Sequence, residues 1–153
     1  MTLATLIAAL GCGLMAGVFF AFSTFVMKAL ARIPEDEGIA AMQSINRTVI
    51  NPWFMLVFLG TAGICAVLAT VAVLRWGTQR EPYLLAGSAL YLVGTVLVTL
   101  AFNVPKNNEL AKLGRGDPRG SMLWPRYLST WTAWNHVRTV AALAAAVSLI
   151  LAL

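Results

Sequence analysis

The segment 131–138, WTAWNHVR, combines side chains that can exchange protons, bind anions and stack on flat rings. It holds the only histidine of the chain and two of its five tryptophans, and its notable members are Trp131, Trp134, Asn135, His136 and Arg138. On a helix, Trp131, either Trp134 or Asn135, and Arg138 fall on one stripe, because residues three and four apart lie on the same face. His136 lies roughly 100° further round. Unpaired polar groups are costly inside an apolar helix, so the segment predicts a functional site or a satisfied polar network.

The composition of the chain indicates an integral membrane protein. The chain has 153 residues, the size of one domain, so residues 1–153 are predicted to form a single unit. Hydrophobic residues make up 59% and charged residues 11%, against roughly 45–50% and about 25% in soluble domains. The net charge of +5 comes from basic residues between apolar runs, without a nucleic-acid-binding motif. The lipid bilayer is therefore the predicted partner, with no nucleic acid and with a homo-oligomer as an open alternative.

Four apolar runs predict an all-α fold, a bundle of four transmembrane helices. Their expected ranges are about 2–31, 52–75, 82–104 and 127–153. Apolar residues from Ile39 to Val49 repeat at helical spacing, so residues 36–49 are predicted to form a short amphipathic helix after the first span. The short connection 75–81 makes the second and third spans antiparallel neighbours.

Local signals predict how these helices end and pack. Pro105 disfavours helix at the residue before it, so the third helix should end or bend there, and the fourth should start between Pro125 and Ser129. Small residues recur every four positions in the first run and predict a ridge for close helix packing: Ala9, Gly13, Gly17 and Ala21. Lipid contact or core packing, rather than a ligand wall, is predicted for four phenylalanines: Phe19, Phe20, Phe22 and Phe25.

Basic residues predict the orientation of the chain in the membrane. Four spans put both termini and the 75–81 connection on one side, and the two longer connections on the other. The longer connections and their flanks carry most of the positive charge: Lys28, Arg32, Arg47, Lys106, Lys112, Arg115, Arg119 and Arg126. The positive-inside rule therefore predicts a plasma (inner) membrane protein with cytoplasmic long connections and external termini.

The same topology gathers polar residues from three parts of the sequence. The segment 131–138 is joined by amide side chains near other helix ends: Gln43, Asn46, Asn51, Asn103 and Asn107. We expect them to surround one cavity. The alternative is an interfacial belt, in which tryptophan and tyrosine lie among headgroups and arginine reaches water. A belt accounts easily for Trp53 and less well for Arg138, which lies roughly three turns inside its predicted helix.

Cysteine and histidine usage predicts no metal site. Cys12 and Cys65 lie in separate apolar runs, the chain has no CxxC pair, and one histidine cannot build a metal site alone. A haem held by His136 is compatible with this count but has no positive sequence support. No metal and no other cofactor are predicted.

Several segments resemble the anthrone oxygenase-like family of small four-helix membrane proteins. The matching pieces are residues 17–23 (GVFFAFS), 41–46 (AMQSIN), 51–52 (NP), 103–107 (NVPKN) and 131–138. They are spread over most of the chain, and the last piece is the most specific. The resemblance implies a four-helix membrane fold and the oxidation of an anthrone to an anthraquinone by O₂, without a metal or flavin.

Under this resemblance, the polar residues receive provisional roles. His136 is the candidate base that removes a proton from the anthrone methylene. Arg138 and an amide of Asn103, Asn107 or Asn135 are candidates for stabilising the resulting oxyanion, and Trp131 and Trp134 for stacking on a flat substrate. Gln43, Asn46 and Asn51 complete the predicted binding site. Each role has a structural alternative, since His136 can bond a carbonyl and tryptophans can be interfacial.

Three functions therefore stay open from the sequence. The first is a cofactor-independent oxygenase that acts on an apolar aromatic compound. The second is a non-catalytic binder or carrier of a hydrophobic small molecule. The third is a structural or assembly subunit that uses the small-residue ridge. A cavity that reaches the polar residues favours the first two, and a packed network without a cavity favours the third.

Overall fold

The computed structural model describes residues 2–75, 77 and 79–153, and these residues form helices and connections with no strand among them. Four helical units are long and apolar enough to cross a membrane: Thr2–Leu30, Pro52–Leu74, Glu81–Leu110 and Gly120–Leu151. The predicted fold class, an all-α bundle with four apolar spans, is therefore confirmed. The predicted short connection 75–81 includes residues 76 and 78, which lie outside the described residues.

Two of the four spans change helix type along their length without being interrupted. The elements follow in this order: α1 (Thr2–Ala21), π-helical η1 (Phe22–Val26), α2 (Met27–Leu30), α3 (Glu35–Thr48), α4 (Pro52–Leu74), α5 (Glu81–Tyr91), π-helical η2 (Leu92–Leu97), π-helical η3 (Thr99–Asn103), α6 (Val104–Leu110) and α7 (Gly120–Leu151). The first span thus consists of α1, η1 and α2, and the third runs from α5 through α6. The amphipathic helix predicted at 36–49 is α3.

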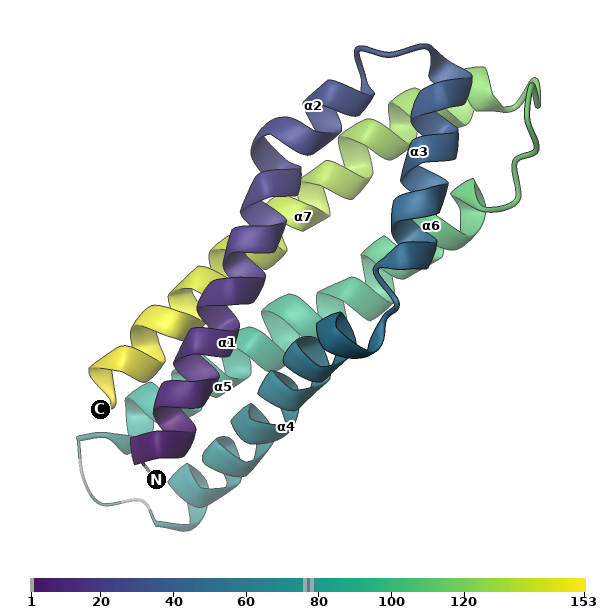
Figure 1. The fold of residues 1–153 in the computed structure, drawn as a ribbon. Helices are drawn as coiled ribbons and strands as arrows, with labels where there is room; N and C mark the ends of the chain where they lie inside the picture. Colours follow the sequence, from purple (N-terminus) through teal and green to yellow (C-terminus); the bar gives the residue numbers. More distant parts are fainter. Residues whose placement is uncertain (1, 76, 78) are drawn as a thin grey trace.

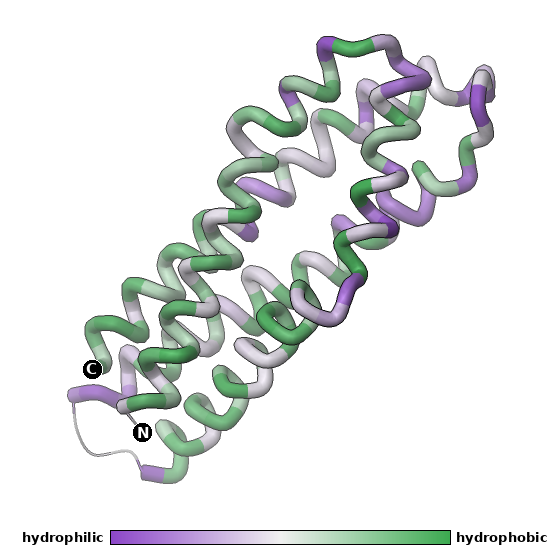
Figure 2. The backbone as a smooth tube through the Cα atoms, in the orientation of Figure 1, coloured by the Kyte–Doolittle hydropathy of each residue, from purple (hydrophilic) through white to green (hydrophobic). Residues whose placement is uncertain are grey.

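The four spans form a ring of neighbours. α1 packs against α7 and α4, and α5 also packs against α7 and α4. Both termini lie at one end of the bundle, whereas α3 and the 111–119 connection lie at the other (Figure 1). Figure 2 shows mainly hydrophobic residues along the spans and more hydrophilic ones in α3 and the 111–119 connection. We call these the terminal end and the loop end.

The start of each helix after the first span has a local cause. Asn51 caps α4, since its Oδ1 accepts a hydrogen bond from the Phe54 N–H at 3.0 Å, and Pro52 occupies the first turn. α3 follows Pro34 and begins with three acidic residues, 35–37, which interact favourably with the positive end of the helix dipole. These two signals place α3 across the loop end, between the first and second spans.

Two prolines do not end their helices: the third span continues past Pro105, so its predicted end there is wrong, and the start predicted for the fourth helix between Pro125 and Ser129 is also wrong. Pro105 lies in the first turn of α6, directly after η3, where the hydrogen bonding changes from the π-helical to the α-helical pattern. The backbone N–H that Pro105 lacks therefore falls where the backbone hydrogen bonds of the helix already change their spacing. α7 begins at Gly120 and contains Pro125. The proline removes a bond to the carbonyl of Ser121, an exposed residue near the polar helix end where water can satisfy that carbonyl.

The glycines that allow close helix contact are not those of the predicted ridge. Gly13 and Gly17 are exposed, and a Cβ at either would meet no neighbouring atom within 4 Å. The ridge prediction is therefore wrong for Gly13 and Gly17 within this chain, whereas Ala9 of the same ridge is buried in the terminal core. Gly11 packs directly on Thr61 of α4 instead, and a Cβ at Gly87 would lie 3.1 Å from the carbonyl oxygen of Ala145 in α7. A four-residue spacing of small residues identified the helix but not its buried face.

Two hydrophobic cores stabilise the bundle. The terminal core is formed by α1, α4, α5 and α7 and contains many small side chains, among them Ala8, Cys12, Cys65, Ala142, Ala145 and Leu149. The loop-side core joins α2, α3, α7, the end of α6 and the connection that follows α6. Its side chains are larger, among them Met27, Met42, Leu110, Trp124, Tyr127 and Trp131. At the terminal end, Arg80 donates to the carbonyls of Ala152 and Leu153 and ties the start of α5 to the end of α7.

Candidate functional site

A cavity of about 240 Å³ lies between the two cores. Its walls come from α1, η1, α3, α4, η3, α6 and α7 and are largely apolar, with Phe19, Phe58 and Trp131 among them. Polar side chains of α3, η3, α6 and α7 also line it: Asn46, Thr99, Asn103, Asn107, Asn135 and Arg138. The cavity thus combines aromatic walls with a small set of polar groups, which is typical of a small-molecule site.

Arg138 places a guanidinium in the wall of this cavity. The residue is only 5% exposed. Its Nη2 donates to Asn135 Oδ1 at 2.6 Å, and its Nη1 donates to Thr99 Oγ1 at 3.1 Å. The guanidinium carbon also lies 4.3 Å from the centre of the Phe19 ring and 5.2 Å from that of Trp131. Two aromatic faces and two oxygen acceptors therefore fix its position.

No carboxylate pairs with Arg138 in the part of the chain that the structure describes. A buried cation without a counter-ion is costly, and in proteins such charges are usually paired. The neutral oxygens of Asn135 and Thr99 offset only part of the lost hydration. The positive charge is therefore available to an anionic or strongly dipolar oxygen of a bound molecule.

Asn135 is the centre of the polar contacts between α7 and the first span. Its Nδ2 donates to the Phe19 carbonyl and to Ser23 Oγ, both at 2.7 Å, while its Oδ1 accepts from Arg138. Thr139 lies 3.3 Å from Ser23 between their hydroxyl oxygens and donates to the Asn135 carbonyl. Asn135 is fully buried, so these bonds satisfy its amide and orient Arg138.

Two of the three π-helical segments, η1 and η3, lie where the polar residues of α7 meet the neighbouring spans. Asn135 bonds Ser23 within η1 and the Phe19 carbonyl just before it, while Arg138 bonds Thr99 at the start of η3. A π-helical turn holds more residues than an α-helical turn and interrupts the usual backbone ladder, which is why such turns recur at functional sites. Both partner spans of α7 are therefore irregular beside the cavity.

Two buried polar atoms of the cavity wall have no hydrogen-bond partner among the described residues: Arg138 Nε and Asn103 Oδ1. Asn103 is fully buried, and its Nδ2 donates to the Trp131 carbonyl at 3.2 Å. One orphan atom is a donor and the other is an acceptor. Because an unsatisfied buried polar group costs on the order of 1–3 kcal/mol, a ligand or water that bonds both atoms would stabilise the protein.

A second network fixes the aromatic wall near the loop end. Asn107 Oδ1 accepts hydrogen bonds from the Tyr127 hydroxyl and from the Trp131 indole N–H, both at 2.8 Å. Asn46 of α3 lies 3.5 Å from the Tyr127 oxygen, and the rings of Tyr127 and Trp131 stack at 6.0 Å. α3, α6 and α7 are thus joined through one tyrosine, and the Trp131 ring is held in a single orientation.

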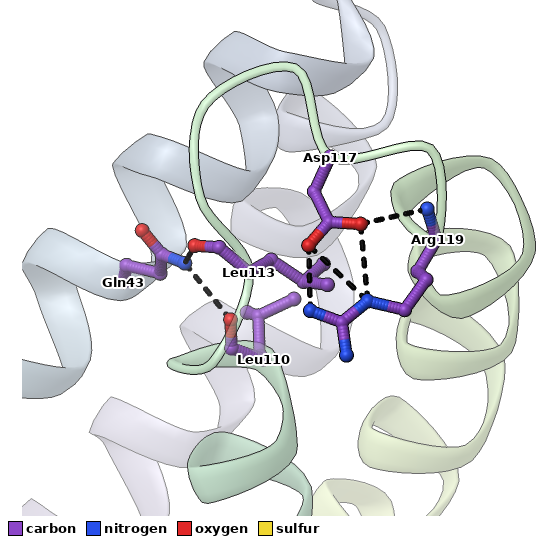
Figure 3. Close-up of polar contacts among 5 residues, drawn as sticks. All are labelled: Gln43, Leu110, Leu113, Asp117 and Arg119. Carbon is purple, nitrogen blue, oxygen red and sulfur yellow. Dashed lines mark hydrogen bonds and ion pairs between the residues drawn. The ribbon is translucent and has the colours of Figure 1, made fainter.

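The structure places six of the ten predicted site residues in the cavity wall: Asn46, Asn103, Asn107, Trp131, Asn135 and Arg138. The other four, Gln43, Asn51, Trp134 and His136, are not part of this wall. Gln43 and Asn51 have structural contacts. Gln43 Nε2 donates to the carbonyls of Leu110 and Leu113, at 2.8 and 3.0 Å, and joins α3 to the end of α6 (Figure 3). Asn51 is the α4 cap.

Trp134 and His136 lie on outward faces of α7. The Trp134 ring stacks on Phe102 with 3.6 Å between ring centres, so this face of the ring is occupied by the protein. His136 is exposed and is one residue from Asn135, which the helical rotation of about 100° carries to a different face. The structure therefore gives neither residue the cavity contact that its expected role requires.

Three wall or support residues were not singled out as site residues from the sequence: Phe19, Ser23 and Thr99. Phe19 packs in the terminal core and Phe22 against the loop-side core, as the prediction of core packing requires, and both also line the cavity. Phe20 and Phe25 are 57% and 60% exposed, as expected for lipid contact. Ser23 and Thr99 are polar residues inside apolar spans, and that was the available signal. Such residues usually face the interior of a bundle, where they hydrogen-bond across helices.

The 111–119 connection carries an ion pair outside the spans. Arg119 donates to both carboxylate oxygens of Asp117, and its Nη2 lies 2.6 Å from Oδ2 (Figure 3). These side-chain hydrogen bonds, followed by one from the Arg119 backbone, lower the pKa of Asp117 to about 2. The pair therefore stabilises the connection above the ordinary aspartate pKa of about 4, and this contribution is lost as the pH falls through about 2.

Other potential ligands do not form a metal centre in the described residues. No group of three or more His, Cys, Asp or Glu side chains lies together there. Cys12 and Cys65 are free thiols buried in the terminal core, away from the cavity wall. The polar groups that could hold a ligand are therefore the amides and guanidinium of the cavity.

The chain matches the anthrone oxygenase family over residues 54–148, which is more than half of its length. The matched region includes α4, the third span and most of α7, and it therefore holds Asn103, Asn107, Asn135 and Arg138. No curated protein and no solved structure matches the chain. The chain belongs to the anthrone oxygenase family.

Proposed function

We propose that this protein is a membrane-embedded, cofactor-independent oxygenase that oxidises an apolar aromatic substrate of the anthrone type with O₂. The observation that carries the proposal is the buried Arg138 guanidinium, which has no carboxylate partner among the described residues and lies in an aromatic cavity between the spans. Family membership supports the same reaction class. The substrate, the reaction and the absence of a cofactor are all part of the proposal.

The cavity fits an aromatic molecule with one polar edge. Phe19, Phe58 and Trp131 offer ring surfaces, and burial of a flat apolar ligand against them is favourable. The polar edge would face Arg138 and Asn103, whose orphan donor and acceptor need partners. A ketone oxygen that can become an enolate oxygen satisfies the donor, and a water or a substrate hydroxyl satisfies the acceptor.

Arg138 would act by stabilising charge as it develops. Loss of a proton from the anthrone methylene moves negative charge to the ketone oxygen, where a preorganised guanidinium in a site with little water is most effective. The electron-rich anion then transfers electrons to O₂ and forms a hydroperoxide at the former methylene carbon. Loss of water leaves a second carbonyl there. One anthrone and one O₂ thus give one anthraquinone and one water, and O₂ is the only oxidant.

The base in this scheme is water rather than His136. His136 is exposed on another face of α7, and no Asp, Glu, His or Lys side chain lines the cavity. By stabilising the enolate, Arg138 makes the methylene more acidic, so that a weak acceptor suffices. Asn135 has a positioning role, because its Oδ1 holds the guanidinium at 2.6 Å.

The membrane setting of the proposal follows the charge distribution. The long connections, which carry most of the basic residues, would lie in the cytoplasm, and both termini would lie outside a plasma (inner) membrane. The cavity, on the loop-end side of the terminal core, would then lie in the cytoplasmic half of the bilayer. An apolar aromatic molecule reaches that depth by partitioning into lipid.

A binder or carrier of a hydrophobic small molecule is the second candidate. The observation that favours it is again the missing base, because the cavity wall offers hydrogen bonds and stacking but no side chain that readily takes a proton. The two functions predict the same ligand and differ only in turnover. Binding of an anthrone without O₂ consumption would establish the carrier.

The test is O₂ uptake with a panel of anthrones in nanodiscs, with a chelator present and with product identified as the anthraquinone. Arg138→Gln should lower turnover by about 10²–10³-fold, the usual effect of removing an oxyanion donor. Arg138→Lys keeps the charge but loses the planar fork, so it should recover only part of the activity. Arg126→Gln, on an exposed arginine of the same helix, is the matched control.

The outcomes separate the candidate functions. Substrate-dependent O₂ uptake that falls in Arg138→Gln and not in Arg126→Gln supports the proposed oxygenase. Activity of Arg138→Gln at the wild-type level removes the guanidinium from the mechanism. Loss of activity on chelation shows that a metal takes part. Anthrone binding without O₂ uptake by the wild-type protein assigns the carrier function.

A further inference from the structure

The cavity is closed along the axis of the bundle in both directions. Toward the terminal end, Phe58 and Phe19 belong both to the cavity wall and to the terminal core, whose residues are at most 7% exposed. Toward the loop end, Met42 and Trp131 belong both to the wall and to the loop-side core. Gln43 also holds α3 against the end of α6. Packed side chains therefore block entry of a ligand along the axis of the bundle.

The side of the bundle offers the remaining route. Only two residues of the cavity wall are exposed, Ile50 at 72% and Leu100 at 59%, and both are apolar. Phe54, Met55 and Val18, also in the wall, are half-buried and apolar. The accessible part of the wall thus lies between the start of α4, with its link from α3, and Leu100 of η3, and it presents mainly hydrocarbon.

The packing of α4 explains why the wall is open there. Within the described part of the chain, α4 makes its main contacts with α1, α5 and η2, and none of them with η1, α2, η3 or α6. Figure 1 shows α4 diverging from the first span toward its own N-terminal end, where α3 joins it. The first turns of α4 are held by the Asn51 cap, the chain leading to α3 and the packing of Phe54 on Phe58, and they leave the side toward η3 open.

We propose that the cavity takes up its substrate sideways from the lipid, through a mouth at the first turns of α4 that Ile50, Met55 and Leu100 surround. This inference rests on the proposed function only for the identity of the ligand, a planar apolar molecule dissolved in the bilayer. Entry from lipid keeps such a molecule out of water until its polar edge reaches Arg138, and it avoids the cost of exposing aromatic surface. α3 covers the mouth on the side of the loop end.

Site-directed quenching tests which phase the mouth faces. Met55→Cys is labelled with a bimane, in nanodiscs made with and without doxyl-labelled phosphatidylcholine, and iodide is the aqueous quencher. Cys12 and Cys65 are fully buried, so unlabelled wild type checks for background. Val67→Cys, on an exposed lipid-facing position of α4, is the matched control. We expect doxyl lipid to quench both labels strongly and iodide to quench neither. Strong iodide quenching at Met55→Cys alone would show an aqueous opening and overturn the proposal.

Uptake kinetics test whether the mouth is the route. Vesicles that carry the protein are mixed with vesicles loaded with anthracene, and quenching of tryptophan fluorescence reports its arrival. Met55→Trp should slow uptake by at least about fivefold, because overpacking of this size obstructs the passage. Val67→Trp should leave the rate unchanged. Equal rates in the wild type and both variants would overturn lateral entry at this mouth, and slow uptake in Val67→Trp as well would show a general defect that also contradicts it.

These measurements do not depend on catalysis. Anthracene cannot form an enolate, so uptake reports entry whether or not the protein consumes O₂. Failure of the oxygenase test with normal anthracene uptake would overturn the proposed reaction and leave the mouth in place. Normal turnover together with strong iodide quenching at the mouth would overturn lateral entry from lipid and leave the proposed reaction in place.

Discussion

The terminal core and the loop-side core are built on the same spans but pack by different means. In the terminal core, small side chains such as Ala142, Ala145 and Gly87 let helices approach closely. In the loop-side core, large rings and amides such as Trp131, Tyr127 and Asn107 keep the helices apart and bridge them with hydrogen bonds. Close packing leaves no room for a ligand, whereas bridged packing leaves a cavity between its supports.

The difference also extends to the helix backbones. Regular α-helix forms most of the terminal end in α1, α4 and α7, while η1 and η3 interrupt the first and third spans beside the cavity. η1 meets Asn135 and η3 meets Arg138, both polar side chains of α7, whereas η2 packs against the terminal core. Membrane bundles can thus concentrate their polar chemistry at one depth while a closely packed region supplies stability.

The largest stability effect should come from disturbing the close packing. Gly87→Leu places a side chain where even a Cβ would lie 3.1 Å from the Ala145 carbonyl oxygen and 2.8 Å from Leu149 Cγ. Because a backbone cannot move as a flexible side chain does, the loss should reach about 3 kcal/mol in unfolding by denaturing detergent. Gly13→Leu, at an open helical position, should leave stability unchanged or raise it. Equal losses in both variants would contradict the assignment of the close-packed face.

A smaller loss should follow removal of the bridging amide in the polar region. Asn135→Leu breaks its three side-chain hydrogen bonds, to Phe19, Ser23 and Arg138. At about 0.6 kcal/mol for each bond across membrane helices, the expected destabilisation is about 2 kcal/mol in the same unfolding assay. Turnover should fall as well, because the guanidinium loses its closest acceptor. Asn108→Leu, on an exposed residue, is the control, and a folded variant with full turnover would show that Asn135 does not position Arg138.

A cap at the edge of the polar region should contribute less. Asn51→Ala removes the acceptor for the Phe54 N–H, and loss of a helix N-cap costs about 1 kcal/mol. Asn51→Asp keeps an acceptor at the cap and should retain most of the stability. Turnover in the presence of saturating anthrone should change little in either variant. A drop in turnover that exceeds the drop in stability would give Asn51 a direct part in the site.

The smallest effect should come from His136. His136→Ala changes an exposed side chain outside the cavity wall, so stability should stay within about 0.5 kcal/mol and turnover within about twofold of wild type. The O₂-uptake assay and detergent unfolding measure both. A decrease of about 10²-fold or more, typical of a lost general base, would restore the histidine to the mechanism.

The fold could be predicted because it depends on local properties of the chain. Apolar runs of spanning length, the repeat at 39–49 and the Asn51-Pro52 start determine four spans and α3, since backbone groups in lipid must bond within their own helix. Helix ends were predicted less well. The prolines at 105 and 125 were expected to mark boundaries, but neighbouring π-helical geometry and a polar helix end accommodate them.

The types of the polar residues were also set by the sequence, but their grouping was not. Asn103, Asn107, Asn135 and Arg138 stood out because polar side chains are rare in such runs. Helical spacing put Asn135 and Arg138 on one stripe and turned His136 away from it, but only the packed bundle showed which stripe faces the cavity. Trp131 and Trp134 are three residues apart and were expected on one face, but Trp131 is buried in the cavity wall whereas Trp134 stacks on Phe102.

Contacts between distant segments decided the rest of the site. Phe19 lies under the guanidinium, although nothing in its local sequence distinguishes it from a core residue. Thr99 and Ser23 complete the hydrogen bonds, and their polarity inside apolar spans did not show which partners they have. Gly11 contacts α4, whereas Gly13 faces outward. The way α1 packs against α4 and α7 decides which glycine is in contact, and the spacing of the glycines does not. The sequence by itself determined which helices form and which polar groups they carry. The tertiary structure decided which of those groups share a cavity, since that depends on how each helix is rotated against its neighbours.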